Sequence, residues 1–292
     1  MVYSVGDDGK PDEILNTENL VYKLKKGTHA LEADLNSLNI EYIGFAHTNS
    51  VFKDKKVREA FNLAIDRNQI VERDLNGDVI AVEYGFIPYM TGYPIEKIRG
   101  HQHNVAKAKS LMAEAGYPDG RDFPVVDYYV NSAENSASFK MAEAVVKSLK
   151  ENLNITVKII KVSYQEREDA VKSGKAAMWR SGWLADYPDP ENFLNIFVGS
   201  DETQEIAAIN PFKYNSQEFN DLFERAKRET NGEERMRLYA ACDQLIIDDA
   251  VVMPLFYKDF ITMVNLKAKK FETNQMERLD FTRVYIKELV TN

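Results

Sequence analysis

The fold is decided by the stretch MWRSGWLADYPDP at residues 178–190. Its first half alternates, with Trp179, Ser181 and Trp183 on one face, and this alternation predicts a β-strand. The prolines at positions 188 and 190 lack the N–H that a strand donates to its neighbour, so the strand must end in a loop. Open α/β sheets carry their ligand sites at the carboxyl ends of strands, and this loop is therefore a candidate site.

Upstream segments extend this strand into a sheet. Residues 124–130 and 155–162 predict two more strands, and 135–153 predict a helix between them. A short helix at 165–172 leads back to the strand that carries the tryptophans. Strands that alternate with helices indicate an α/β fold with a largely parallel or mixed sheet covered by helices.

Further strands are predicted at 40–46, where an isolated Gly44 permits either close approach of the backbone to another group or a bend, and at 251–257. Four residues have the side chains and positions of helix N-caps, namely Asp54, Asp66, Asn104 and Ser216. Another helix is predicted from residue 232. Residues 2–39 are weakly patterned, with a possible strand at 20–24, and the tail after 258 fits either edge strands or a helix.

The composition is that of an ordinary globular protein. The 292 residues include 37 basic and 46 acidic side chains, giving a net charge of −9, so a nucleic-acid partner is not expected. Cys242 stands alone in an apolar helical pattern, which excludes an internal disulfide and predicts a buried thiol. No Gly-rich phosphate loop or cysteine-built metal site is present, and we expect no cofactor.

Several motifs, in order, resemble one known family. They are the stretch 182–190 followed by Phe193 and Leu194, and the segments 56–67, 113–118 and 253–257. Together they resemble the peptide-type solute-binding proteins of ABC importers, the oligopeptide and dipeptide receptors, over about residues 40 to 260. The resemblance implies a lobe like that of type II periplasmic-binding proteins.

The resemblance also implies a domain arrangement. Residues 40–258 would form the ligand-binding C-terminal lobe, with hinge strands at both ends. Residues 1–39 would be a remnant of the first lobe or an N-terminal extension, and 259–292 would return to the first lobe. Members of the family are substantially longer, so we expect this chain to be a fragment that folds but binds peptide weakly or not at all.

The function that the resemblance implies is capture of short peptides outside the cytoplasm, without catalysis. Its partners would be a short peptide and the permease subunits of an ABC transporter. The location would be the periplasm or the cell surface, with an export signal and any lipid anchor absent from this chain. No window of the sequence approaches a membrane span, so contact with the membrane would be through an anchor or the permease.

In the family, the aspartate at the position of Asp186 binds the free α-ammonium of a peptide. A carboxylate in a poorly solvated site is costly to leave unpaired, and an ammonium group relieves that cost. The alternative is that Asp186 accepts backbone N–H bonds within its own turn. Arg180 either holds a ligand carboxylate with two hydrogen bonds or is a rim arginine paired with a surface acid.

Aromatic residues complete the candidate site. The two tryptophans are expected to divide between core and ligand-facing wall, with Trp183, nearer the strand end, in the wall. Tyr187 lies in the same loop as Asp186. Tyr84 and Phe212 match family segments near the ligand, and packing in the core is the alternative for both.

Two other functions stay open. Related receptors take nickel chelates, haem or oligosaccharides, and the pair Ala46-His47 departs from the Phe-Asn that the family often has. A hydrolase could use Asp186 with Asp189 or Glu191 as a carboxylate pair, although three acids around one turn tend to lie on one side of a substrate. Neither a Ser/His/Asp signature nor another catalytic motif supports an enzyme.

Overall fold

The computed structural model describes residues 2–5, 11–15, 21–22, 29–34, 37–75, 79–199, 210–258, 260–265, 267–272, 274–276, 278 and 280–287. In 2–34 and 260–265 it describes the backbone alone. None of the helices within these residues is long and apolar enough to span a bilayer.

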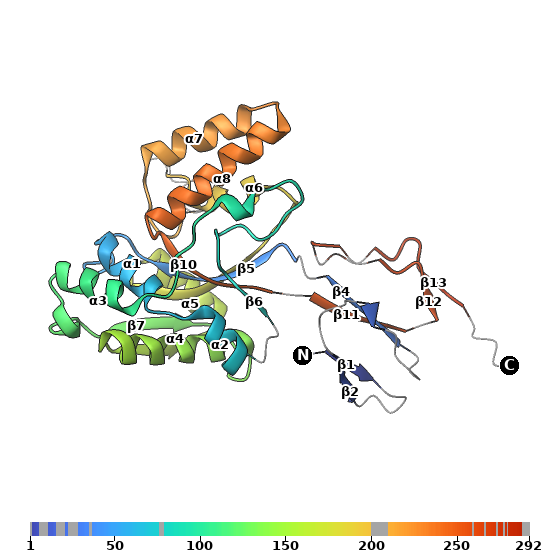
Figure 1. The fold of residues 1–292 in the computed structure, drawn as a ribbon, viewed down its shortest axis with the longest axis horizontal. Helices are drawn as coiled ribbons and strands as arrows, with labels where there is room; N and C mark the ends of the chain where they lie inside the picture. Colours follow the sequence, from blue (N-terminus) through green and yellow to red (C-terminus); the bar gives the residue numbers. More distant parts are fainter. Residues whose placement is uncertain are drawn as a thin grey trace.

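A six-stranded sheet forms the centre of the molecule (Figure 1). Its strands, in spatial order, are β6 (Val79–Ala81), β10 (Val252–Lys258), β5 (Asn39–Phe45), β9 (Met178–Leu184), β7 (Val126–Val130) and β8 (Val157–Lys161). Pairing is parallel among β9, β7 and β8 and antiparallel from β6 through β10 and β5 to β9. The α/β fold with a mixed sheet is therefore confirmed, with parallel pairing confined to the strands around α4 and α5.

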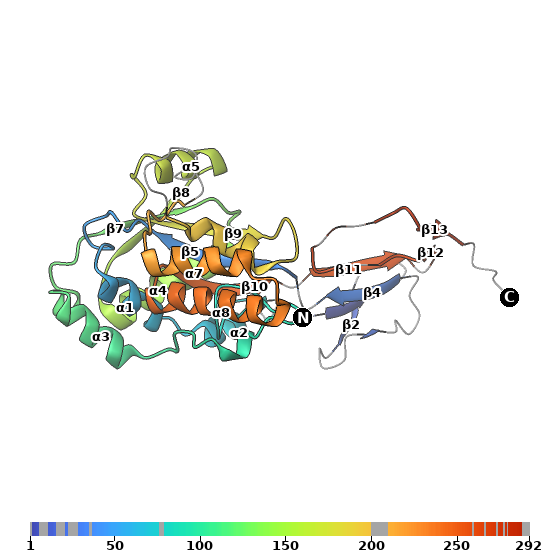
Figure 2. The ribbon, with the colours of Figure 1, turned by 90° about the horizontal axis from the view of Figure 1, so that it is seen from above.

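Helices cover both faces of the sheet (Figures 1 and 2). One face packs against α1 (Lys55–Leu63), α2 (Arg67–Asp74), α3 (Val105–Glu114) and α4 (Ala137–Leu153). The other packs against α6 (Pro190–Leu194), α7 (Gln217–Arg228) and α8 (Gly232–Asp248), with α5 (Tyr164–Lys172) beside the end of β8. Single turns of 3₁₀ helix occur at Ile95–Lys97, Pro118–Gly120 and Asn195–Phe197.

Local sequence signals account for where the helices begin. The side chains of Asp54, Asp66, Asn104 and Ser216 each accept a hydrogen bond from the first turn of the following helix, as predicted. Asn231 caps α8 in the same way. Cys242 of α8 is fully buried, also as predicted.

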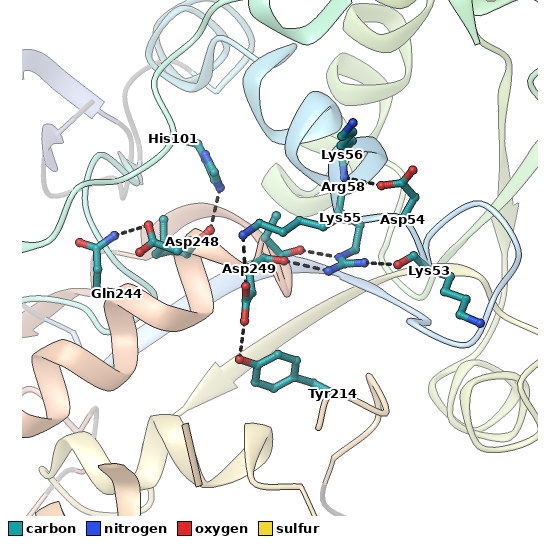
Figure 3. Close-up of polar contacts among 12 residues, drawn as sticks. Lys53, Asp54, Lys55, Lys56, Arg58, His101, Tyr214, Gln244, Asp248 and Asp249 are labelled. Carbon is teal, nitrogen blue, oxygen red and sulfur yellow. Dashed lines mark hydrogen bonds and ion pairs between the residues drawn. The ribbon is translucent and has the colours of Figure 1, made fainter. Parts of the chain in front are cut away.

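Buried arginine fixes the connection between α8 and β10 (Figure 3). Arg58 of α1 donates from Nη2 to the carbonyl of Asp249 at 2.9 Å and from Nε to that of Ala250 at 3.0 Å. The Asp249 carboxylate accepts from Lys55 at 3.2 Å and from the Tyr214 hydroxyl at 2.8 Å. These contacts tie the end of one helix to the start of another, so the path of β10 into the sheet is set.

The remaining strands lie beyond the ends of β5 and β10, apart from the six-stranded sheet (Figures 1 and 2). They form three small antiparallel groups: β1 (Val2–Val5) with β2 (Pro11–Leu15), β11 (Phe260–Asn265) with β4 (His29–Asp34) and β3 (Val21–Tyr22), and β12 (Ala268–Lys269) with β13 (Tyr285–Ile286). The described part of the tail therefore forms strands, one of the two structures that its sequence allowed. Leu38 donates to the carbonyl of Gln275 at 2.8 Å, which brings the tail back to the start of β5.

Candidate functional site

A cavity of about 510 Å³ opens at the carboxyl ends of β7 and β9. It is lined by Asn39, Glu41, Tyr42, Asn131, Tyr164, Arg167, Glu168, Val171, Trp179, Arg180, Ser181, Gly182, Trp183, Leu184, Ile196, Pro211 and Lys258. Because β7, β8 and β9 are parallel, their carboxyl ends meet at one edge, and α4 and α5 both begin there. The cavity has the place and the size of a small-molecule site in an α/β protein.

The two tryptophans of β9 divide as the sequence predicted. Trp179 is buried and stacks on Phe212, with 5.8 Å between ring centroids, whereas Trp183 is half-buried. A Cβ at Gly44 would lie 2.4 Å from the Trp179 ring, so the close approach predicted at this glycine is confirmed. Both rings border the cavity, but Trp179 belongs to the core, whereas Trp183 is the more exposed part of the wall.

Arg180 pairs with a buried acid and not with an acid on the rim. Glu41 of β5 is 1% exposed and forms ion pairs with Arg180 and with Lys258, whose Nζ is 2.6 Å from Oε1. Arg180 Nε donates to Glu41 Oε2 at 2.7 Å. A carboxylate this deeply buried needs such partners, and two cations around one anion leave this wall of the cavity with a net positive charge.

Another part of the wall comes from α5. Arg167 donates from Nη1 to the Arg180 carbonyl at 2.9 Å and from Nη2 to Glu168 at 2.5 Å, and its guanidinium carbon lies 4.9 Å from the Tyr164 ring centroid. Among the described residues its buried Nε has no partner. Tyr164 is largely exposed at the mouth of the cavity, so this wall combines an aromatic ring with fixed charge.

The loop that follows β9 holds Asp186 by its backbone. The Asp186 N–H donates to Asn192 Oδ1 at 3.1 Å, and the Asp186 carbonyl accepts from Arg278 Nη2 at 2.8 Å. The residue is exposed, and within the described part of the chain its carboxylate makes no hydrogen bond or ion pair. Asp189, instead, accepts the turn N–H of Glu191 at 2.9 Å, so the turn role considered for Asp186 is filled by its neighbour.

Asp189 is also engaged by a second element. Arg235 of α8 donates to its two oxygens at 2.7 and 2.8 Å, and both side chains are partly buried. The bidentate pair anchors the start of α6 on α8.

Reasoning from the sequence missed Asn192. Its amide oxygen accepts from the Trp183 indole at 2.9 Å as well as from the Asp186 backbone, and the residue is 5% exposed. Burial raises the pKa of Tyr187, and a hydrogen bond with Asn192 acts against that rise. The available signal was a lone amide between the helix start at Pro190 and the apolar pair Phe193-Leu194.

The six residues predicted for the site are not all brought together. Arg180 and Trp183 line the cavity, and Asp186 and Tyr187 follow in the loop that leaves its wall. Phe212 is 0% exposed between Trp179 and Phe197, so it supports the wall from behind while Pro211 reaches the surface.

Tyr84 lies elsewhere, in the segment that follows β6 at the edge of the sheet. It lines a second cavity of about 340 Å³, together with Tyr89 and Ile80.

Comparison with known proteins gives consistent results. The family model "Bacterial extracellular solute-binding proteins, family 5 Middle" matches residues 12–205. Heme-binding protein A of Haemophilus influenzae is 30% identical over 235 residues, which are 80% of this chain and 42% of that protein. The periplasmic oligopeptide-binding protein OppA of Salmonella typhimurium is 30% identical over 222 residues, 74% of this chain and 39% of that protein.

The fold is shared with solved structures. The periplasmic binding protein DppA from Helicobacter pylori, solved with the peptide STSA, has a TM-score of 0.75 and 25% identity over 89% of this chain and 49% of its own. The predicted fold, a lobe like that of type II periplasmic-binding proteins, is thereby confirmed. The chain spans about two fifths of the length of the two curated relatives and about half of the solved chain.

Proposed function

The chain belongs to the bacterial extracellular solute-binding proteins of family 5, and on that premise we propose that it captures short peptides for an ABC importer. The relative from Salmonella is named as an oligopeptide-binding protein, and the solved relative from Helicobacter holds a peptide. The cavity beside β9 supports the same reading, because it combines aromatic walls with fixed charges of both signs.

The observation that carries the proposal is the state of Asp186. Its backbone is held on both sides, yet its carboxylate is exposed and unpaired within the described residues. Such a group binds an ammonium without first breaking an internal contact, and the hydrogen bond that forms is charge-assisted. Recognition of a terminal ammonium suits peptides of many sequences, because every free peptide has one.

The other predicted residues take roles set by their surroundings. Trp183 provides an apolar wall, and Tyr187 presents a hydroxyl from the same loop as Asp186. Arg180 meets a ligand carboxylate only by sharing its guanidinium with Glu41, so its main effect is a positive potential at this wall. Phe212 acts through the packing of Trp179, and Tyr84 has no role in this site because it lines a second cavity.

The proposal includes an arrangement of the chain. Residues 40–258 serve as the ligand-binding lobe, and 1–39 and 259–292 connect it to the remainder of a two-lobed receptor. Such a receptor works outside the cytoplasm, passes peptide to permease subunits, and changes no covalent bond. Asp189 does not favour a carboxylate pair with Asp186, because Arg235 already holds both of its oxygens.

Haem is the second candidate ligand, since a relative at 30% identity is named for it. An axial ligand to haem iron is commonly histidine. His47 and His101 contact the carbonyls of Val251 and Ile247 at 3.0 and 2.9 Å, and no described histidine side chain lines the cavity. The described lobe therefore favours peptide.

The test is a titration followed by NMR, with the whole chain, trialanine and N-acetyl-trialanine. We expect the free peptide to shift the Trp183 indole and Asp186 amide signals with a Kd of about 1 mM. The binding should be this weak because the chain matches only 49% of the solved relative. The acetylated peptide, which lacks the ammonium, should shift them at least about 10-fold less strongly. Equal responses would exclude recognition of the ammonium, and a response to haemin alone would favour the second candidate.

A further inference from the structure

We propose that Asn192 is the positioning residue of this site: one side-chain amide oxygen fixes the indole of Trp183 and the backbone of Asp186 relative to each other. The inference rests on the proposed function for its consequence in ligand binding. The positioning depends only on contacts that Asn192 makes in the absence of a ligand.

The amide oxygen of Asn192 contacts two groups of the site. Asn192 Oδ1 accepts from Trp183 Nε1 at 2.9 Å and from the Asp186 N–H at 3.1 Å. A carbonyl oxygen has two lone pairs, so these two bonds use its full capacity. The indole of Trp183 and the backbone N–H of Asp186 are therefore held by one atom, Asn192 Oδ1.

The Asn192 amide is itself held rigidly. Asn192 is buried in α6, where its neighbours Phe193 and Leu194 are both fully buried in the core. The start of α6 is in turn anchored by the ion pair between Asp189 and Arg235 of α8. The amide cannot rotate without disturbing the core, so it acts as a fixed reference for the loop.

The loop between these residues is held within the same turn. The Tyr187 hydroxyl donates to Glu191 at 3.2 Å, and Glu191 directly precedes Asn192 in α6. Two of the six residues predicted for the site, Trp183 and Asp186, therefore depend on a seventh, which need not touch a ligand to act.

The consequence is pre-organisation. Without the amide, the Trp183 ring and the Asp186 carboxylate would sample independent positions, and a ligand would have to order both on binding. Asn192 removes this cost in advance. Its loss should weaken ligand binding about 10-fold while contacts made directly by the ligand stay available.

The experiment first uses the ligand-free chain. It has two tryptophans, so the indole region of a ¹⁵N spectrum contains two signals, and Trp179→Phe assigns them. In Asn192→Leu we expect the indole of Trp183 and the amide of Asp186 to exchange with solvent about 5- to 10-fold faster, while Trp179 is unchanged. Asn192→Asp, which keeps acceptor oxygens, should restore slow exchange at both groups.

The matched control is Asn210→Leu. Asn210 is also 5% exposed and donates to the carbonyls of Phe197, Val198 and Tyr214, so its loss perturbs the same core without touching Trp183. Faster exchange at Trp183 in both leucine variants would overturn the proposal, as would unchanged exchange at Trp183 and Asp186 in Asn192→Leu. Should Asn192→Leu not fold, Asn192→Ser is measured in its place with the same expectation.

A second arm separates this inference from the proposed function. Trialanine is titrated into the wild-type chain and into Asn192→Leu, and the variant should bind about 10-fold more weakly. If the wild-type chain does not respond to trialanine, the peptide proposal fails, but the ligand-free exchange rates still decide whether Asn192 positions the loop. Equal affinities of the two chains would overturn the positioning role in binding.

Discussion

Asp186 and Asp243 each lie beside a loop that packs on the same face of the sheet, and the protein uses them in opposite ways. Asp243 of α8 is 0% exposed and accepts from the N–H groups of Phe86 and Ile87 at 2.7 and 3.1 Å and from the Tyr93 hydroxyl at 2.9 Å. Asp186 is exposed, and its loop is held through the backbone by other residues.

The difference separates a carboxylate with a structural role from one that we propose to bind a ligand. The oxygens of Asp243 are committed to the segment 85–87, which Tyr257 also holds by donating to the Gly85 carbonyl at 2.8 Å. A Cβ at Gly85 would lie 2.3 Å from Asp243 Oδ2, so the fit leaves no room for a larger residue. Around Asp186 the protein satisfies the backbone with Asn192 and Arg278, and within the described residues the carboxylate is left unpaired.

The largest effect should come from removing the committed carboxylate. We expect Asp243→Ala to lower the free energy of unfolding by about 3 kcal/mol or more, because two buried N–H groups and a hydroxyl lose their acceptor. Urea denaturation measures the change. Asp186→Ala, the matched control, should stay within about 0.5 kcal/mol of wild type. Similar losses in the two variants would break the comparison.

The same contrast should be visible as a dependence on pH. Burial raises the pKa of Asp243 from 3.8 to about 6, so between these values the folded chain keeps a proton that the unfolded chain has lost. The part of Asp243's contribution to stability that depends on pH is therefore full below about pH 4 and is lost as pH rises through about 6.

The difference in unfolding free energy between wild type and Asp243→Asn isolates this contribution. It should fall by on the order of 2 to 3 kcal/mol from pH 4 to pH 6.5. The pKa values of His47 and His101 are lowered to about 4 by burial, and their effect, opposite in sign, is present in both chains and cancels. A flat difference across this range would show that Asp243 is ionised throughout.

A third expectation concerns the available carboxylate. Asp186→Asn should weaken binding of trialanine about 10-fold, the loss expected for a hydrogen bond between charged groups, and leave binding of N-acetyl-trialanine unchanged. The titration described above, repeated on the variant, gives both values. If both peptides lose affinity equally, Asp186 does not meet the ammonium.

The smallest effect should come from the contact on the carbonyl of Asp186. Arg278→Met removes one exposed hydrogen bond and should cost less than about 1 kcal/mol of stability. Amide exchange at Asp186 and Tyr187 should nevertheless become a few-fold faster, since the loop loses one of the two hydrogen bonds to the Asp186 backbone. Arg283→Met, also exposed, is the control and should leave these amides unchanged.

Much of the fold could be predicted because its signals are local. Alternation marked β9, prolines marked its end, and single polar residues such as Asp54 and Ser216 marked helix starts. Gly44 predicted a close approach, which the Trp179 ring makes. Each of these features depends on a few neighbouring residues and on rules that hold in any protein.

The partners of the polar side chains could not be predicted, because they are distant in sequence. Arg180 meets Glu41 across 139 residues, and Asp243 meets Phe86 across 157. Strand order decides such pairs, and the sequence did not reveal that β5 lies beside β9 or that Tyr84 lines a different cavity. Phe212 fitted a wall or a core equally well, and only the packing of Trp179 distinguishes them.

The single buried thiol has a practical consequence. Cys242 precedes Asp243, is sealed in α8, and burial raises its pKa to about 12, so a maleimide can react only when this helix separates from the segment that it holds. The rate of alkylation in native buffer therefore reports how often α8 separates from this segment. The measurement needs no substitution or added residue in the protein.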